Sequence, residues 1–400
     1  MTNQTTFFPS ISRSAQAIEP FHVMKILGEA KQLEAQGRNV IHMEIGEPDF
    51  ASLQKVHEAA HNAVSQGLTH YTPSLGLPQL RDKLANFYAE FYQAKVDSDN
   101  VMITPGSSSA LQLLLTAILN PDDKIMLADP SYPCNRQFIK LLQAQICAVN
   151  VSDSSNYQLN LELIQQHWKN GIKAVMVASP ANPTGTIIEQ TELFKMATFL
   201  AEQNSYLIVD EIYQGLVYDR APESILAHKN LPNNVIVINS FSKFFNMTGW
   251  RLGWSVAPEH LMPVLERLAQ NLYLAAPTPS QYAAVRVLDT DCLDELEQRR
   301  QVFQQRRDTL VKAMQQAGFT IKVIPNGAFY LYWDVSAITE DSAQFCFDLL
   351  QKTGVAITPG IDFGDFQANT HVRIAYTCDE RLILKAVNKI KDFVTEQNGN

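Results

Sequence analysis

The sequence predicts an α/β protein with a smaller α+β unit, and three observations carry this prediction. Short apolar runs alternate with amphipathic stretches of helical length between residues 101 and 257. The runs are almost continuous in Val, Ile and Leu, as in strands of a parallel sheet that are buried on both faces. The alternation ends after Pro279, where a long charged stretch begins. Strand–helix alternation of this kind implies right-handed crossovers in one open sheet.

The expected elements follow in chain order. A first helix spans residues 22–37 and is stopped by Gly37. Strands of the sheet are expected at residues 101–104, 124–128, 174–178, 206–209, 235–239 and 252–257, with helices at 108–119 and 189–204 between them. The C-terminal part has helices at 293–316, 342–353 and 380–397 and strands at 327–335 and 370–376. We therefore expect an N-terminal segment (1–45) that joins the small domain, a large domain (46–285) and a small C-terminal domain (286–400).

Composition limits the possible functions and locations. A chain of 400 residues, 46% hydrophobic and 18% charged, has material for two packed regions. The net charge of −9 argues against nucleic acid or an anionic membrane as the main partner. Five cysteines without CxxC spacing suit a reducing compartment. Residues 1–6 lack the features of a secretion signal, and no apolar run is long enough to cross a bilayer, so we expect a cytoplasmic protein.

Polar residues follow five of the apolar runs. These segments are Pro105-Gly106-Ser107-Ser108-Ser109, Asp129-Pro130-Ser131-Tyr132-Pro133, Ser179-Pro180-Ala181-Asn182-Pro183-Thr184-Gly185, Asp210-Glu211-Ile212-Tyr213 and Ser240-Phe241-Ser242-Lys243. Ligands of open α/β sheets bind beyond the carboxyl ends of the strands. The sequence therefore predicts a site at this edge that combines hydroxyls, an aromatic ring, an amide, a carboxylate and an amine.

Six motifs along the chain resemble those of the class I/II aminotransferases of fold type I. They are Gly46-Glu47-Pro48-Asp49-Phe50, Tyr71-Thr72-Pro73, Asn182-Pro183-Thr184-Gly185, Asp210-Glu211-Ile212-Tyr213, the stretch from Ser240 through Lys243 and Arg251 to Gly253, and Arg373-Ile374-Ala375-Tyr376. The resemblance implies a mostly parallel sheet of the seven-stranded type and pyridoxal phosphate (PLP) as cofactor. It also implies transfer of an amino group from an α-amino acid to a 2-oxo acid, and a homodimer with shared active sites.

The resemblance assigns the catalytic roles to Lys243, Asp210 and Tyr213. Lys243 would hold PLP as a Schiff base and move the α-proton; a desolvated, cation-rich site would keep its amine unprotonated. Asp210 would pair with the pyridinium nitrogen of the cofactor, and a carboxylate directly after a buried strand does need a cationic partner. Tyr213, together with Asn182, would hydrogen-bond the phenolic oxygen of the cofactor.

Other residues would bind the phosphate, the ring and the substrate. Gly106, Ser107 and Ser108 begin a helix, where free N–H groups bind anions, although an ordinary helix cap is the alternative for the serines. Ser240 and Arg251 would complete the phosphate site. By the resemblance, Tyr132 would stack on the ring and Tyr71 would reach the phosphate of the neighbouring subunit. Arg373 would clamp the substrate α-carboxylate, beside the backbone of Gly46.

Several alternatives stay open or are disfavoured. PLP-dependent lyases use the same fold and site, and a non-enzymatic PLP-binding regulator would need a DNA-binding domain for which the short leader before Gly46 leaves no room. A nicotinamide dehydrogenase would require a G-x-G-x-x-G motif, which the sequence lacks. His57-Glu58-Ala59-Ala60-His61 fits a zinc pattern, but a solvated helix face explains it better, and we expect no metal. The amino donor is not identified, although residues 273–279 lack a basic residue for an acidic side chain.

Overall fold

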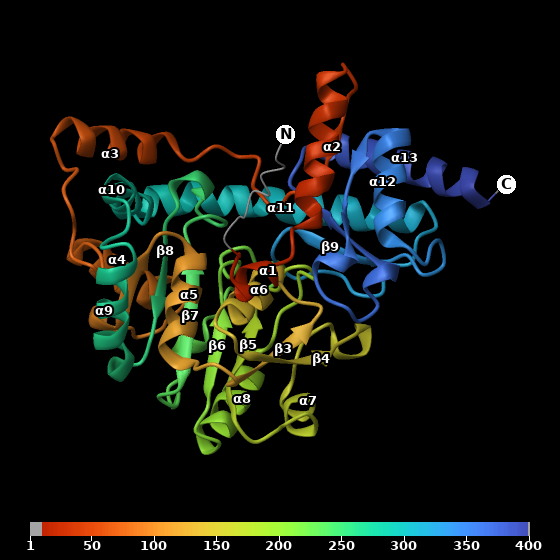
Figure 1. The fold of residues 1–400 in the computed structure, drawn as a ribbon. Coiled ribbons are helices and arrows are strands. Elements are labelled where there is room, and N and C mark those ends of the chain that lie inside the picture. The colour runs from red at the N-terminus through yellow and green to blue at the C-terminus, as the bar shows by residue number, and fades with distance from the viewer. Residues whose placement is uncertain (1–9, 399–400) are drawn as a thin grey trace, which may run out of the picture.

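A computed structural model describes residues 10–398 of the chain. Residues 1–6, for which the sequence predicts no secretion signal, lie outside the described residues. The centre of the fold is a seven-stranded sheet with the order β2-β8-β7-β6-β5-β3-β4 (Figure 1). The strands are β2 (Val101–Thr104), β3 (Lys124–Asp129), β4 (Gln145–Asn150), β5 (Ile172–Ala178), β6 (Tyr206–Asp210), β7 (Val235–Ser240) and β8 (Gly253–Val256). Strand β8 runs antiparallel to both neighbours, and all other pairs are parallel. The predicted fold class is confirmed.

Alternating side chains of the buried strands supply two separate cores. In β7, Val235 and Val237 belong to one core, whereas Ile236 and Ile238 belong to the other. The first core is covered by α7 (Leu161–Gln166) and α8 (Gln190–Glu202). The second is covered by α5 (Ser107–Ile118), α6 (Pro133–Leu141) and α9 (Met262–Leu272). Because successive side chains of a strand point to opposite faces, a continuous apolar run is what a sheet covered on both faces requires.

Strand β4 is the one strand of the large sheet that the sequence reading missed. It lies at the sheet edge, and of its six residues only Val149 is buried. An edge strand with one buried position lacks the continuous apolar content that predicted the other strands. The predicted helices and strands elsewhere agree with the structure to within a few residues at their ends, where assignments normally vary.

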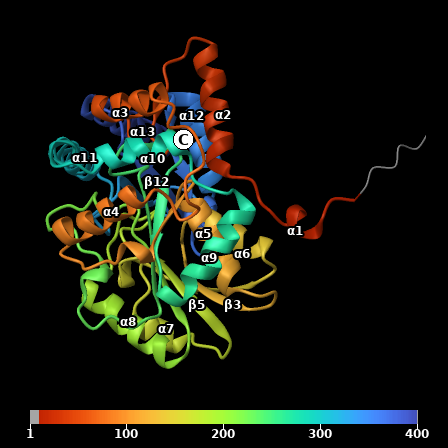
Figure 2. The ribbon, with the colours of Figure 1, turned by 90° about the vertical axis from the view of Figure 1, so that its left-hand side faces the viewer.

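A smaller unit lies beyond the carboxyl ends of the large sheet. Its three-stranded antiparallel sheet has the order β11-β12-β9, from Thr358–Pro359, His371–Ala375 and Tyr330–Asp334. Helix α12 (Ser342–Thr353) covers it, and α13 (Glu380–Asn398) packs against α12. Helix α2 (His22–Ala35) lies beside α12 in both views (Figures 1 and 2). Strand β1 (Ile41–His42) pairs in parallel with β10 (Val355–Ala356). Residues near the N-terminus therefore pack against the C-terminal part of the chain.

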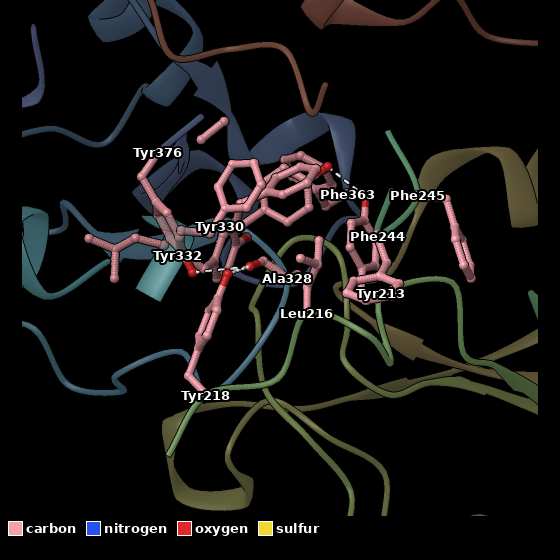
Figure 3. Packing of buried hydrophobic residues seen from close by; sticks show 14 of the residues in the cluster. Tyr213, Leu216, Tyr218, Phe244, Phe245, Ala328, Tyr330, Tyr332, Phe363 and Tyr376 are labelled. Atoms are coloured by element: carbon pink, nitrogen blue, oxygen red, sulfur yellow. Dashed lines mark hydrogen bonds between the residues drawn. The ribbon is translucent and has the colours of Figure 1, made fainter. Parts of the chain in front are cut away.

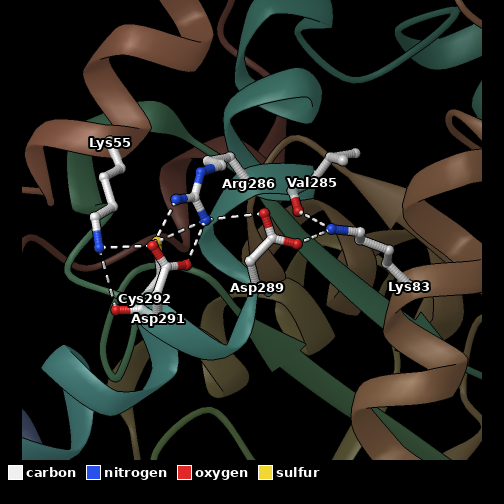
Figure 4. A network of polar contacts seen from close by, with 7 residues as sticks. All are labelled: Lys55, Lys83, Val285, Arg286, Asp289, Asp291 and Cys292. Atoms are coloured by element: carbon white, nitrogen blue, oxygen red, sulfur yellow. Dashed lines mark hydrogen bonds and ion pairs between the residues drawn. The ribbon is translucent and has the colours of Figure 1, made fainter.

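The long helix α11 (Thr290–Gln316) connects the two regions, and a charged network fixes its first turn (Figure 4). Asp291 binds Lys55 on α3 (Gln54–Ser65) and Arg286 on α10 (Thr278–Val287). Asp289, at the N-cap, binds Lys83 on α4 (Pro78–Phe91). Exposed ion pairs of this kind contribute about 1 kcal/mol or less each, so the network orients the helices more than it stabilises them. Among the described residues, no helix is long and apolar enough to span a membrane.

Candidate active site

A cavity of about 390 Å³ lies between the carboxyl ends of the large sheet and the smaller unit. This volume is in the range of small-molecule sites. All but two of the predicted site residues line it: Gly46, Ser107, Ser108, Tyr132, Asn182, Asp210, Tyr213, Ser240, Lys243, Arg251 and Arg373. Of the two others, Gly106 lies against the guanidinium of Arg251. Tyr71 is 83% exposed and lies on the loop between α3 and α4.

Lys243 follows β7 and points across the cavity toward the N-terminal part of the chain. Its Nζ atom donates a 2.8 Å hydrogen bond to the backbone oxygen of Gly46. Burial lowers the pKa of Lys243 to about 8, against the attraction of Glu47; the nearby charges of Arg373 and Arg251 lower this pKa further. A much larger fraction of this amine is therefore neutral near pH 7 than for an ordinary lysine, as a nucleophilic amine requires.

Asp210 ends strand β6, where the main chain leaves the sheet. Its Oδ1 atom accepts a hydrogen bond from the N–H group of Ile212 at 3.1 Å. Burial raises the pKa of Asp210 to about 7, and this backbone bond and the charge of Lys243 only partly offset the rise. Within the described part of the chain, no cationic side chain pairs with it. A buried carboxylate in this situation fits a ligand that brings a positive charge of its own.

The first turn of α5 and Arg251 together form a cradle for an anion. No described side chain caps the N-terminus of α5, so its first N–H groups remain free for a ligand. Gly106 precedes the helix with a φ of +81°, and a Cβ atom there would lie 2.7 Å from Nη2 of Arg251. Arg251 donates to the backbone oxygen of Thr248, and no acidic side chain among residues 10–398 pairs with it. Its charge is therefore available to a phosphate-like group.

Arg373 on β12 is a buried guanidinium that is held by neutral groups. Its Nη1 atom donates to Asn182 Oδ1 at 2.9 Å, and its Nη2 atom donates to Thr358 Oγ1 at 3.2 Å and to the backbone oxygen of Glu44. Its Nε atom is buried without a hydrogen-bond partner among the described residues. A buried cation with neutral partners and an unused donor is suited to binding a carboxylate.

Tyr330 is a site residue that sequence reasoning missed. Its hydroxyl lies 2.7 Å from that of Tyr213, a bond drawn in Figure 3, and the guanidinium of Arg373 lies 4.5 Å from its ring centre. A Cβ atom at position 46 would lie 1.8 Å from the Tyr330 hydroxyl oxygen, so only glycine fits there without a shift of Tyr330. Tyr330 belongs to the aromatic run Tyr330-Leu331-Tyr332-Trp333, in which nothing distinguishes a site residue from a core residue.

Further lining residues come from segments that carry no motif. Phe21, Val23 and Met24, at the start of α2, line the cavity, as does Phe363 of the smaller unit. A separate lining residue, Asn135 on α6, is buried, and its Oδ1 atom has no partner within the described range.

The family model for aminotransferase class I and II matches residues 38–390. The chain belongs to this family. An aminotransferase of this class uses PLP to move amino groups between amino acids and oxo acids, and the cavity fits that cofactor. The anion cradle suits its phosphate, the carboxylate of Asp210 suits its protonated ring nitrogen, and the amine of Lys243 suits its aldehyde.

Known relatives of this aminotransferase cover nearly its whole length. It is 34% identical to (5-formylfuran-3-yl)methyl phosphate transaminase of Methanocaldococcus jannaschii, over 96% of this chain and 100% of the relative. It is 33% identical to valine–pyruvate aminotransferase of Mycobacterium tuberculosis, over 95% of this chain and 97% of the relative. A crystal structure of Thermus thermophilus aspartate aminotransferase with maleate superposes with a TM-score of 0.90 at 30% identity, covering 96% of this chain and 100% of that one. These names differ in their substrates, so the relatives identify the reaction type but not the donor.

The zinc-like pattern of this aminotransferase lies outside the cavity. His57 on α3 stacks on Trp250 with ring centres 6.0 Å apart. The part of the chain that the structure describes contains no group of three or more His, Cys, Asp or Glu side chains that could hold a metal ion.

Proposed function

We propose that Lys243 binds PLP covalently and, after the amine of the donor has displaced it, moves the proton of the substrate α-carbon, while Arg373 binds the α-carboxylate. The observation that carries this proposal is the convergence in one cavity of a buried amine of lowered pKa with a carboxylate and two cations that have no oppositely charged partner among the described residues. When bound, the cofactor ring supplies an electron sink for the charge that develops at the α-carbon.

The other side chains position the reacting groups. Asp210 holds its negative charge against the ring nitrogen, and Tyr213 and Asn182 hydrogen-bond the phenolic oxygen. The cradle of Gly106, Ser107, Ser108, Ser240 and Arg251 binds the phosphate, and Tyr132 stacks on the ring. The bond between Tyr330 and Tyr213 and the bond between Arg373 and Asn182 support these assignments, because each ties one proposed ligand contact to another.

Replacing the proposed nucleophile tests the assignment. Lys243→Ala should lower turnover by about a thousandfold or more, because among the described residues that line the cavity Lys243 is the one lysine that can take the α-proton. A small primary amine added to the buffer should restore part of the rate, since it can act as a base in the space that the side chain leaves. Lys195→Ala, on the exposed face of α8, is the matched control and should keep normal turnover. Normal turnover in Lys243→Ala would refute the assignment.

We also propose a homodimer in which Tyr71 reaches the phosphate of the neighbouring subunit. Val64, Leu68 and Tyr71 expose large apolar side chains along one short stretch, which an interface would cover. A second hollow, of about 720 Å³, opens beside Arg251, where a segment of a partner could enter.

We further propose a cytoplasmic location. Among residues 10–398 all cysteines are free, which supports this location. We also propose the domain limits 1–45, 46–285 and 286–400, of which the packing of α2 on α12 supports the joining of the N-terminal segment to the small domain.

A further inference from the structure

Each described cationic side chain that lines the cavity has a role in the proposed reaction. These side chains are Lys243, Arg251 and Arg373. If the proposed function holds, Lys243 reacts with the cofactor, Arg251 binds its phosphate and Arg373 binds the α-carboxylate of the donor. No described lining residue then offers a fourth positive charge, and the stretch around Tyr71 that the proposed dimer would bring to the site (residues 64–79) contains no lysine or arginine, nor do residues 273–279. A second carboxylate on the donor would be desolvated without a partner, which costs several kcal/mol.

The lining also contains acidic groups that would repel such a carboxylate. Asp362 lines the cavity and is buried, and its two oxygens accept hydrogen bonds from the N–H groups of His22 and Val23, both at 2.7 Å. Glu47 lines the cavity near Lys243. An acidic donor side chain near either group would therefore meet a carboxylate rather than a free cation.

Apolar side chains line the same cavity and are called the wall below. The wall consists of Phe21, Val23 and Met24 at the start of α2, with Ile45 and Phe363. Asp362 holds the first turn of α2 in place, and the adjacent Phe363 lies with its ring centre 4.9 Å from the guanidinium carbon of Arg373. The wall is thus tied to the residue that is proposed to bind the α-carboxylate. In Figure 1, α2 runs along the smaller unit down toward the large sheet, with its first turn at that end.

We infer that the amino donor of this enzyme is an α-amino acid with an apolar side chain, which packs against the wall formed by Phe21, Val23, Met24, Ile45 and Phe363. This inference rests on the proposed roles of Lys243 and Arg373. Met24 suits donors of different length, because its unbranched side chain adapts its shape and is 56% exposed at the cavity rim.

A donor panel tests the inference on the PLP-loaded protein. Single-turnover conversion of the cofactor from its aldehyde to its amine form is followed by absorbance with valine, leucine, methionine, phenylalanine, aspartate and glutamate. The apolar donors should give kcat/KM values roughly tenfold or more above those of the acidic donors. Aspartate or glutamate as the best donor would overturn the inference.

A charge placed at the wall provides the second test. Met24→Arg should raise kcat/KM for aspartate by roughly tenfold and lower it for leucine, because it supplies the missing cation. Met24→Gln, of similar length but uncharged, is the matched control and should give no gain with aspartate. Equal aspartate rates in both variants would count against the wall as the side-chain site. Failure of every amino acid to convert the wild-type cofactor would instead overturn the proposed function on which the inference rests.

Discussion

The Nζ atom of Lys243 donates a 2.8 Å hydrogen bond to the backbone oxygen of Gly46, and so joins the end of strand β7 to the segment that follows β1. Gly46 in turn leaves room for the hydroxyl of Tyr330. Three distant parts of the chain therefore meet at Gly46. Any residue larger than glycine at position 46 would displace Tyr330, and with it the partner of Tyr213.

The lowered pKa of Lys243 predicts how PLP attachment depends on pH. The neutral amine is the reactive form, so its fraction increases as pH rises through about 8. The rate of PLP attachment to cofactor-free protein, measured by stopped-flow absorbance, should rise up to about pH 8 and then level off. Glu47→Gln should move the plateau to lower pH, because the attraction of Glu47 raises this pKa. A rate that keeps rising to pH 10 would contradict the lowered pKa of Lys243.

Asp210→Asn removes the anionic partner of the cofactor ring. We expect a folded protein that binds PLP but transaminates about a hundredfold more slowly or worse, because the ring nitrogen is no longer held protonated. Binding of the positively charged ring should lower the pKa of Asp210 below its value of about 7 in the cofactor-free protein, because the two opposite charges attract. Turnover within threefold of wild type in Asp210→Asn would remove this role.

Arg373→Lys tests recognition of the α-carboxylate. Lysine brings a charge but not the planar pair of donors, so kcat/KM should fall for every donor while the cofactor spectrum stays intact. The loss of transition-state stabilisation should be on the order of 2–4 kcal/mol. The loss should be common to all donors, because each carries the same α-carboxylate. A loss confined to a few donors would place Arg373 at the side-chain site instead.

Shared active sites predict complementation between two inactive variants. A heterodimer of Tyr71→Ala and Lys243→Ala subunits contains one site with both residues intact. Random mixing in equal amounts, with subunit exchange, should restore about a quarter of wild-type activity, since half of the dimers are mixed and each has one intact site. Light scattering gives the assembly state of each sample. A fully active wild-type monomer, or a mixture that stays inactive, would refute sharing through Tyr71.

The sequence was sufficient to predict the strand ends, because buried strands are continuous apolar runs and the polar residues follow them directly. It was not sufficient for the residues that meet the cavity from elsewhere. Tyr330 lies in an aromatic strand, and Val23 lies at the start of an ordinary amphipathic helix. Their roles arise from tertiary contacts, namely the 2.7 Å bond to Tyr213 and the capping of α2 by Asp362. Strand β4 was missed for a different reason, because an exposed edge strand has little apolar content.

The most direct test of this account is to identify the lysine that carries the cofactor. Borohydride added to the PLP-loaded protein should fix the cofactor irreversibly, and peptide mapping by mass spectrometry should find the label on Lys243. A label on another lysine, or no label on protein that has bound PLP, would contradict the assignment of Lys243.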